Sequence, residues 1–276
     1  MYGGDAKGRT GSRRQAGGWK AWRSLVIPAE HGGWGFLLEP LLLGLLVAPS
    51  WAAFLLGLST FTAFLLRHPL KLVLVDRRRR LDSPRIQRAR AVIIALVAIS
   101  GACFLGAVWL AGLAFVFPFV LAIPFGAVYL YYDLTKPGRT LQAELTGPLS
   151  LAFVASSMAI MDGWALLTSL ALWAALGLRS VPSVLYVRAR IRLDRGRNPN
   201  IYWPIVTHVL ALVAAGALIS VGLLPALAIV SYTVLLARAL WFLSPQRPMV
   251  QIKTIGFVEL ALGLFLVATL AIGYTL

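Results

Sequence analysis

Two arginines lie inside apolar segments, where an ionised side chain is costly. Arg67 and Arg179 each stand among leucine and alanine residues and precede the polar end of their segment. Arg67 lies about eight residues before that end, which corresponds to a depth of about 12 Å in a helix. Ionisable side chains at such a depth normally face the interior of a helix bundle or a wet cavity. Because guanidinium groups bind phosphate and carboxylate through paired hydrogen bonds, we expect the two arginines to meet at one anion site.

Further polar side chains follow each arginine at helical spacing, and the two stretches form an internal repeat. The predicted ligand-binding residues are Arg67, His68 and Lys71 in the first stretch and Arg179, Ser183, Tyr186 and Arg190 in the second. Residues 66–80 and 178–192 align without a gap, and both arginines are among the identical positions. Repeat-built membrane proteins often place their site where the two halves meet. For Lys71 and Arg190, snorkelling to the membrane surface is the alternative role.

Carboxylates occupy the same predicted half of the membrane. Glu39, Glu144 and Glu259 lie inside apolar segments. They fit two roles: they neutralise the arginines as ion pairs, or they act as a general base or cation site.

Two polar stretches contain the remaining candidate residues of a ligand-binding or proton-handling site. These are Asp133, Lys136 and Arg139 in a predicted loop at 131–140, and Glu30 and His31 in the stretch 28–35. A Pro-Gly turn signal marks the loop, which either closes over a head group or is a solvated connection. Glycines in the second stretch permit close backbone approach, and its two candidates could bind a ligand or carry a proton.

Nine segments are long and apolar enough to form membrane-spanning helices. They comprise residues 33–49, 51–75, 91–112, 114–132, 142–161, 163–187, 203–222, 224–243 and 253–275. Tight turns near Gly112 and Gly222 divide the third segment from the fourth and the seventh from the eighth. We therefore predict an all-α, polytopic membrane protein, with a nine-helix transmembrane domain at 27–276 after a disordered basic arm at 1–26.

Every lysine and arginine falls in the arm, or in or beside the connections on one side of the predicted membrane. Because such loops stay in the cytoplasm, we expect a bacterial cytoplasmic-membrane protein with its N-terminus inside and its C-terminus outside. This asymmetry and attraction to anionic lipid explain the net charge of +16 better than nucleic-acid binding does.

A composition that is 59% hydrophobic and 13% charged excludes an ordinary soluble domain. The single cysteine excludes a disulfide scaffold.

The residues that open the first segment resemble a family signature. Residues 28–35, Pro-Ala-Glu-His-Gly-Gly-Trp-Gly, are followed by Leu37-Leu38-Glu39-Pro40. This pattern is similar to that of the YwiC-like family of bacterial integral membrane proteins, and the resemblance covers most of the chain. It implies a membrane protein and no particular activity.

The layout also resembles that of the UbiA superfamily of intramembrane prenyltransferases. Nine helices, an inside N-terminus and the repeat at the ends of helices 2 and 6 match that superfamily, and residues 132–147 are similar to its segment after helix 4. The resemblance implies a UbiA-like bundle with a cavity that faces the cytoplasm.

The chain departs from that superfamily at its metal-binding motifs. The superfamily's aspartates hold Mg²⁺, which binds a prenyl diphosphate. The corresponding positions here are Arg67, His68 and Lys71 in the first motif and Arg179, Ser183, Arg188 and Arg190 in the second. Hard cations need oxygen ligands, so we expect no metal and no cofactor, although Mg²⁺ is expected of UbiA relatives.

These observations favour one function and leave two alternatives. The favoured hypothesis is a protein that binds an anionic lipid or isoprenoid-type ligand in a cytoplasm-facing, arginine-lined cavity, as a binder or as a metal-independent transferase. The alternatives are a small-anion transporter and a non-catalytic membrane accessory protein. The expected partners are membrane lipid and an isoprenoid or phosphorylated small molecule, and no nucleic acid.

Overall fold

The computed structural model describes residues 33–78, 84–136 and 138–276, and within these ranges the chain forms helices and no strands. The helices are α2 (Gly33–Val47), α3 (Trp51–Arg78), α4 (Pro84–Ala111), the 3₁₀ helix η1 (Ala114–Val116), α5 (Phe117–Thr135), α6 (Leu141–Met161), α7 (Leu166–Asp194), α8 (Tyr202–Ser220), α9 (Ala228–Leu243) and α10 (Ile252–Thr275). The predicted arm at 1–26 and the candidates Glu30 and His31 lie outside the described residues. The predicted all-α class is confirmed for the described part of the chain.

Seven helices are long and apolar enough to cross a membrane, and α2 and α9 are shorter apolar helices. Together they correspond to the nine predicted segments. Three of them exceed the predicted length by three residues or more: α3, α4 and α7 contain 28, 28 and 29 residues. At 1.5 Å per residue each is at least about 42 Å long, which exceeds an apolar layer of about 30 Å. These helices therefore continue beyond the apolar layer.

Three turns at one end of the bundle use glycine in a left-handed conformation. The φ angles of Gly112, Gly163 and Gly222 are 73°, 85° and 74°, a region that residues with a Cβ rarely adopt. The predicted turns near Gly112 and Gly222 are confirmed. The turn at Gly163 is the reason why α7 begins at Leu166 and not at residue 163.

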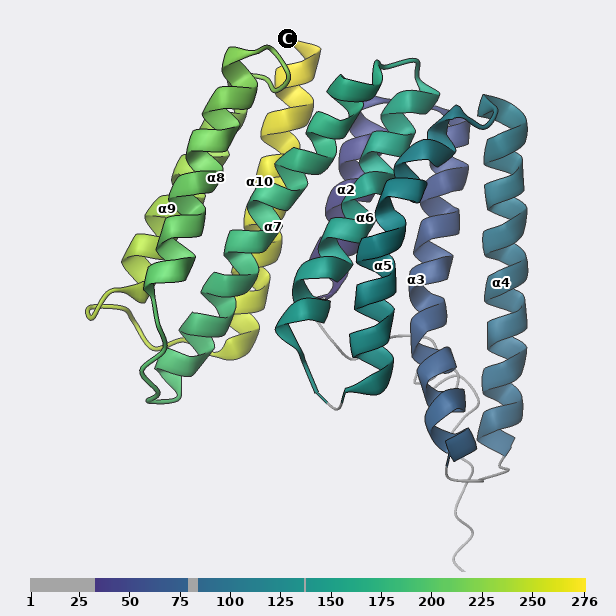
Figure 1. Ribbon diagram of the computed structural model, residues 1–276, viewed down its shortest axis with the longest axis horizontal. Helices are drawn as coiled ribbons and strands as arrows, with labels where there is room; N and C mark the ends of the chain where they lie inside the picture. The colour runs from purple at the N-terminus through teal and green to yellow at the C-terminus, as the bar shows by residue number, and fades with distance from the viewer. Residues whose placement is uncertain (1–32, 79–83, 137) are drawn as a thin grey trace, which may run out of the picture.

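Helices α6 and α7 organise the bundle. Helix α6 packs against α2, α5 and α7 and also contacts α3, whereas α7 contacts α2, α6, α8, α9 and α10. Figure 1 shows α3 and α4 at one edge of the bundle and α8 and α9 at the opposite edge. Contacts of α10 with α2 and α9 connect the two parts. As a result, α7 is the most enclosed of the seven long apolar helices.

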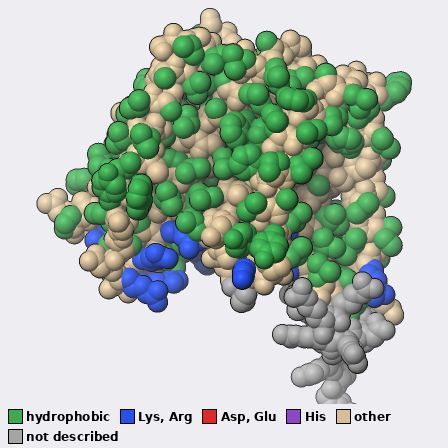
Figure 2. Space-filling view, viewed as in Figure 1, with side chains coloured by type: hydrophobic (Ala, Val, Ile, Leu, Met, Phe, Trp, Pro, Cys, Tyr) green, Lys and Arg blue, Asp and Glu red, His purple; other side chains and the backbone are tan. Residues whose placement is uncertain are grey.

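The surface is divided into an apolar belt and a basic end. Hydrophobic side chains cover the flank of the bundle in Figure 2, and Lys and Arg side chains gather at one end. Trp51 and Trp109, which are 78% and 85% exposed, lie towards the opposite end. We call the end that carries the α5–α6, α7–α8 and α9–α10 connections the basic end. The one-sided distribution of basic residues that the sequence predicts is therefore present in the fold.

Candidate functional site

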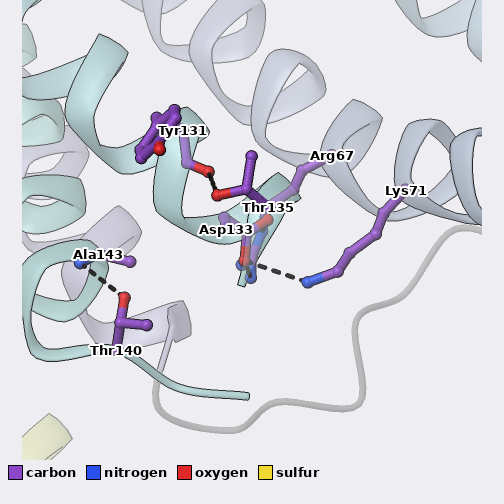
Figure 3. A network of polar contacts seen from close by, with 7 residues as sticks. All are labelled: Arg67, Lys71, Tyr131, Asp133, Thr135, Thr140 and Ala143. Atoms are coloured by element: carbon purple, nitrogen blue, oxygen red, sulfur yellow. Dashed lines mark hydrogen bonds and ion pairs between the residues drawn. The ribbon is translucent and has the colours of Figure 1, made fainter. Parts of the chain in front are cut away.

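The first candidate site is a group of three charges near the basic end of α3 and α5, which we call the basic-end cluster. Arg67 donates two hydrogen bonds to Asp133, from Nε to Oδ2 at 3.1 Å and from Nη2 to Oδ1 at 2.9 Å. Lys71 Nζ donates to the same Oδ1 at 3.2 Å (Figure 3). The Asp133 side chain is only 10% exposed, whereas that of Lys71 is 44% exposed. Two cations of α3 thus contact the same carboxylate of α5.

The structure corrects the predicted loop at 131–140. Asp133 lies in the last turns of α5, which continues to Thr135, and Lys136 N–H still donates to the Tyr132 carbonyl at 3.1 Å. The connection proper begins only after this turn, because the helical hydrogen bonds persist to that point. Thr140 then caps α6 by accepting from the backbone N–H of Ala143 (Figure 3).

The other candidates of this region are dispersed around the cluster. His68 follows Arg67 on α3 and is half-buried, and Lys136 and Arg139 are exposed in the α5–α6 connection. The Arg67 guanidinium also lies 5.4 Å from the centre of the Tyr129 ring, at cation–π distance.

The second candidate site lies inside the bundle, and we call it the interior charge cluster. It comprises Glu39 on α2, Arg179 on α7, Arg238 on α9 and Glu259 on α10. Arg179 Nη1 lies 3.0 Å from Glu39 Oε1, and Arg238 Nη1 lies 2.7 Å from Glu259 Oε1. Glu259 Oε2 lies 3.9 Å from Arg179 Nη2, so that this carboxylate stands between the two guanidinium groups. The cluster contains two positive and two negative groups and is neutral when all four are ionised.

Polar and aromatic side chains of α7 and α8 border the interior charge cluster. Arg238 Nη2 donates to Ser183 Oγ at 3.3 Å, and the guanidinium carbon lies 3.8 Å from the centre of the Tyr186 ring. The Tyr186 ring makes an edge contact with the buried ring of His208. His208 Nδ1 lies 2.6 Å from the Pro204 carbonyl oxygen, so it is the protonated ring nitrogen. The sequence analysis missed Arg238, although a cation inside the apolar segment 224–243 was the available signal.

A glycine on α10 makes room for this arrangement. A Cβ atom at Gly263 would overlap the carboxylate of Glu39 and lie 3.0 Å from Arg179 Nη2. Arg179 Nη2 also donates to the backbone carbonyl of Glu259. The absence of a side chain at Gly263 therefore lets α2 and α7 bring their charges against the α10 backbone.

Arg190 and Glu144, both predicted site residues, have local partners. Arg190 is fully buried and donates to Asp194 Oδ2 at 3.0 Å and to the backbone carbonyls of Phe242 and Pro248. These bonds tie the α9–α10 connection to the end of α7. Glu144 pairs with Arg188 and not with the buried arginines.

The two repeat arginines have separate partners. Arg67 binds the carboxylate of Asp133, whereas Arg179 lies between those of Glu39 and Glu259. Helix α6 contacts both α3 and α7 and lies between them in Figure 1. The expectation that both guanidinium groups meet at one site is therefore wrong, because each arginine has a carboxylate on a neighbouring helix of its own part of the bundle.

An apolar groove of about 390 Å³ lies between α5, α6, α7 and α8. Its walls include Phe125, Phe153, Trp173, Leu218 and Leu223. The rings of Phe153 and Trp173 stack with centres 4.8 Å apart. This groove has none of the cationic side chains that the predicted ligand cavity requires.

Metal-binding side chains do not gather within the described ranges, where no group of three His, Cys, Asp or Glu residues is suitably placed for an ion.

Comparison with known proteins gives one match: the family model described as YwiC-like protein covers residues 27–161. No curated protein and no solved structure matches the chain. The matched region begins with the residues whose pattern resembles the family signature and extends through α2 to α6. The chain is thus an integral membrane protein whose residues 27–161 are similar to the YwiC-like family, as the residues at the start of its first apolar segment indicated.

Proposed function

We propose that this protein binds the negatively charged head group of a lipid or isoprenoid-type molecule at its basic end, between α3 and α5. The observation that carries the proposal is that Arg67 and Lys71 both contact Asp133, while the Lys71 side chain stays 44% exposed. The exposed ammonium of Lys71 donates one hydrogen bond to Asp133 and has two further N–H donors to offer an anion. Guanidinium and ammonium groups hold phosphate oxygens without a metal.

The proposal places the basic end in the cytoplasm of a bacterium and retains a UbiA-like arrangement of the helices. The distribution of lysine and arginine supports the orientation. The likeness of α3 and α7 supports the arrangement, because each has an arginine followed by an internal proline, Pro69 or Pro182, and each is long enough to pass the apolar layer. An acyl or prenyl tail would lie along the apolar flank of the helices while the head group contacts the cluster.

Retention of lipid by the purified full chain tests the proposal. Lys71→Gln removes the exposed cation of the cluster, and Lys253→Gln removes an exposed lysine at the start of α10, at the same end of the bundle. One lysine near an anionic surface contributes about 1 kcal/mol, which is about fivefold in affinity. We expect Lys71→Gln to lower about fivefold the affinity with which the purified chain retains phosphatidylglycerol, and Lys253→Gln to have a smaller effect. An equal loss in both variants would indicate a diffuse surface charge and refute a site at the basic-end cluster.

A further inference from the structure

The interior charge cluster has to remain neutral. Its members have small exposed fractions, from 1% for the Glu39 side chain to 14% for that of Glu259. An uncompensated charge in such surroundings costs several kcal/mol. Any change of charge on one member must therefore be accompanied by an opposite change within the cluster.

Only the carboxylates can change charge, because arginine keeps its proton in proteins. Glu39 is almost fully buried and lies 3.0 Å from Arg179. The Glu259 side chain is the more exposed of the two, at 14%, although both of its carboxylate oxygens are buried. Neither oxygen accepts a hydrogen bond, although both face guanidinium groups. The Glu259 carboxylate is thus held by charge alone, without the aligned hydrogen bonds that fix a bidentate pair.

On the basic-end side of Glu259, one position of α10 carries no side chain. Gly256 precedes Glu259 by three residues on α10, so the two positions lie on neighbouring parts of one helix face. A Cβ atom at Gly256 would have no atom within 4 Å. The carboxyl group can therefore turn away from Arg238 without meeting a side chain at that position.

Arg238 is prepared to hold a replacement anion. Its Nη2 is anchored to Ser183 and its guanidinium plane is supported by the Tyr186 ring, while its buried Nε has no hydrogen-bond partner. A guanidinium group fixed in this way presents paired donors that match the two oxygens of a carboxylate. A small monocarboxylate would occupy the place that the Glu259 carboxylate leaves.

We propose that the interior charge cluster binds one proton and one small monocarboxylate anion together. The proton comes from water and binds a Glu259 carboxylate oxygen, the ion pair with Arg238 opens, and the anion pairs with Arg238. One positive and one negative charge enter, so the cluster stays neutral. This site is separate from the basic-end cluster and does not depend on the head-group proposal.

Several titratable or charged groups surround Glu259. They are Glu39 on α2, Arg179 and Tyr186 on α7, and Arg238 on α9, with His208 on α8 behind the Tyr186 ring. His208 Nε2 is buried and has no hydrogen-bond partner, so this nitrogen is the competing acceptor for the proton.

Calorimetric titration of the purified full chain with sodium acetate, in two buffers of different ionisation enthalpy, measures the protons taken up for each anion bound. For the wild-type protein we expect about one proton per acetate and an affinity that weakens about tenfold per pH unit. Glu259→Gln should bind acetate without proton uptake and independently of pH, and Arg238→Gln should lose binding. Glu144→Gln, which alters a half-exposed ion pair elsewhere, should behave as wild type.

Three results would overturn the proposal. The first is acetate binding to the wild-type protein without proton uptake, or no binding at any pH. The second is proton uptake that persists in Glu259→Gln and disappears in Glu39→Gln or His208→Gln. The third is loss of acetate binding in Lys71→Gln, which would assign the anion to the basic-end cluster. If Glu259→Gln does not fold, the pH dependence and proton count of the wild-type protein decide the question.

Discussion

Removal of the Arg179 guanidinium should strongly destabilise the protein. Arg179→Met retains an unbranched side chain but leaves the carboxylate of Glu39, which is 1% exposed, without the cation that lies 3.0 Å away. Glu259 keeps its partner Arg238. Breaking a buried ion pair from one side costs about 3–5 kcal/mol. We expect the free energy of unfolding to fall by this amount, which is at least about a hundredfold in the unfolding equilibrium.

The opposite substitution should have a smaller effect. Glu39→Gln leaves Arg179 next to the Glu259 carboxylate and with its hydrogen bond to the Glu259 carbonyl, so we expect a loss of about 1–3 kcal/mol. The double variant Glu39→Gln/Arg179→Met contains no orphaned Glu39 carboxylate. Its loss of stability should be smaller than the sum of the two single losses, by a coupling energy of about 1–3 kcal/mol.

Reversible unfolding in mixed micelles, followed by the fluorescence of the nine tryptophans, measures these differences. The matched control is the ion pair of Arg188 and Glu144, whose side chains are 27% and 26% exposed. Arg188→Gln should cost less than about 1 kcal/mol because exposed pairs contribute little. The reasoning fails if Arg179→Met costs no more than this control, or if the double variant loses the sum of the two single losses.

Three further substitutions test individual contacts. Gly263→Ala places a methyl group against the interior charge cluster and should cost about 1–3 kcal/mol, whereas Gly216→Ala on α8, where a Cβ has open space, should not lower the melting temperature. Arg190→Leu removes the donors that hold the connection 244–251, so limited proteolysis should cleave this connection faster than in the wild-type protein. Asp133→Asn removes the carboxylate that competes with a head group for two cations. Retention of phosphatidylglycerol by the purified chain should therefore rise, and a decrease would contradict the proposed role of the basic-end cluster.

Local sequence properties account for the helices and for part of the interior face of α7. A membrane-spanning segment needs about 20 apolar residues and satisfies its own backbone hydrogen bonds, so that nine segments could be recognised without knowledge of their neighbours. Helical spacing also placed Arg179, Ser183, Tyr186 and Arg190 on one face, and all four are buried. The expected ends of the helices were less accurate, since charged residues continue α3, α4 and α7 beyond the apolar layer.

The sequence by itself determined that this chain is a helical membrane protein with its basic residues at one end, because apolar length and charge distribution are local properties. Only the tertiary structure decided which charges meet. Glu39, Glu144 and Glu259 are alike in sequence context, yet Glu144 pairs with Arg188 at the basic end, while the other two lie beside Arg179 inside the bundle. These partners are far apart along the chain, and the packing of α2, α9 and α10 around α7 brings them together. That packing depends on the shapes of whole helix faces, including the space at Gly263, which no local pattern specifies.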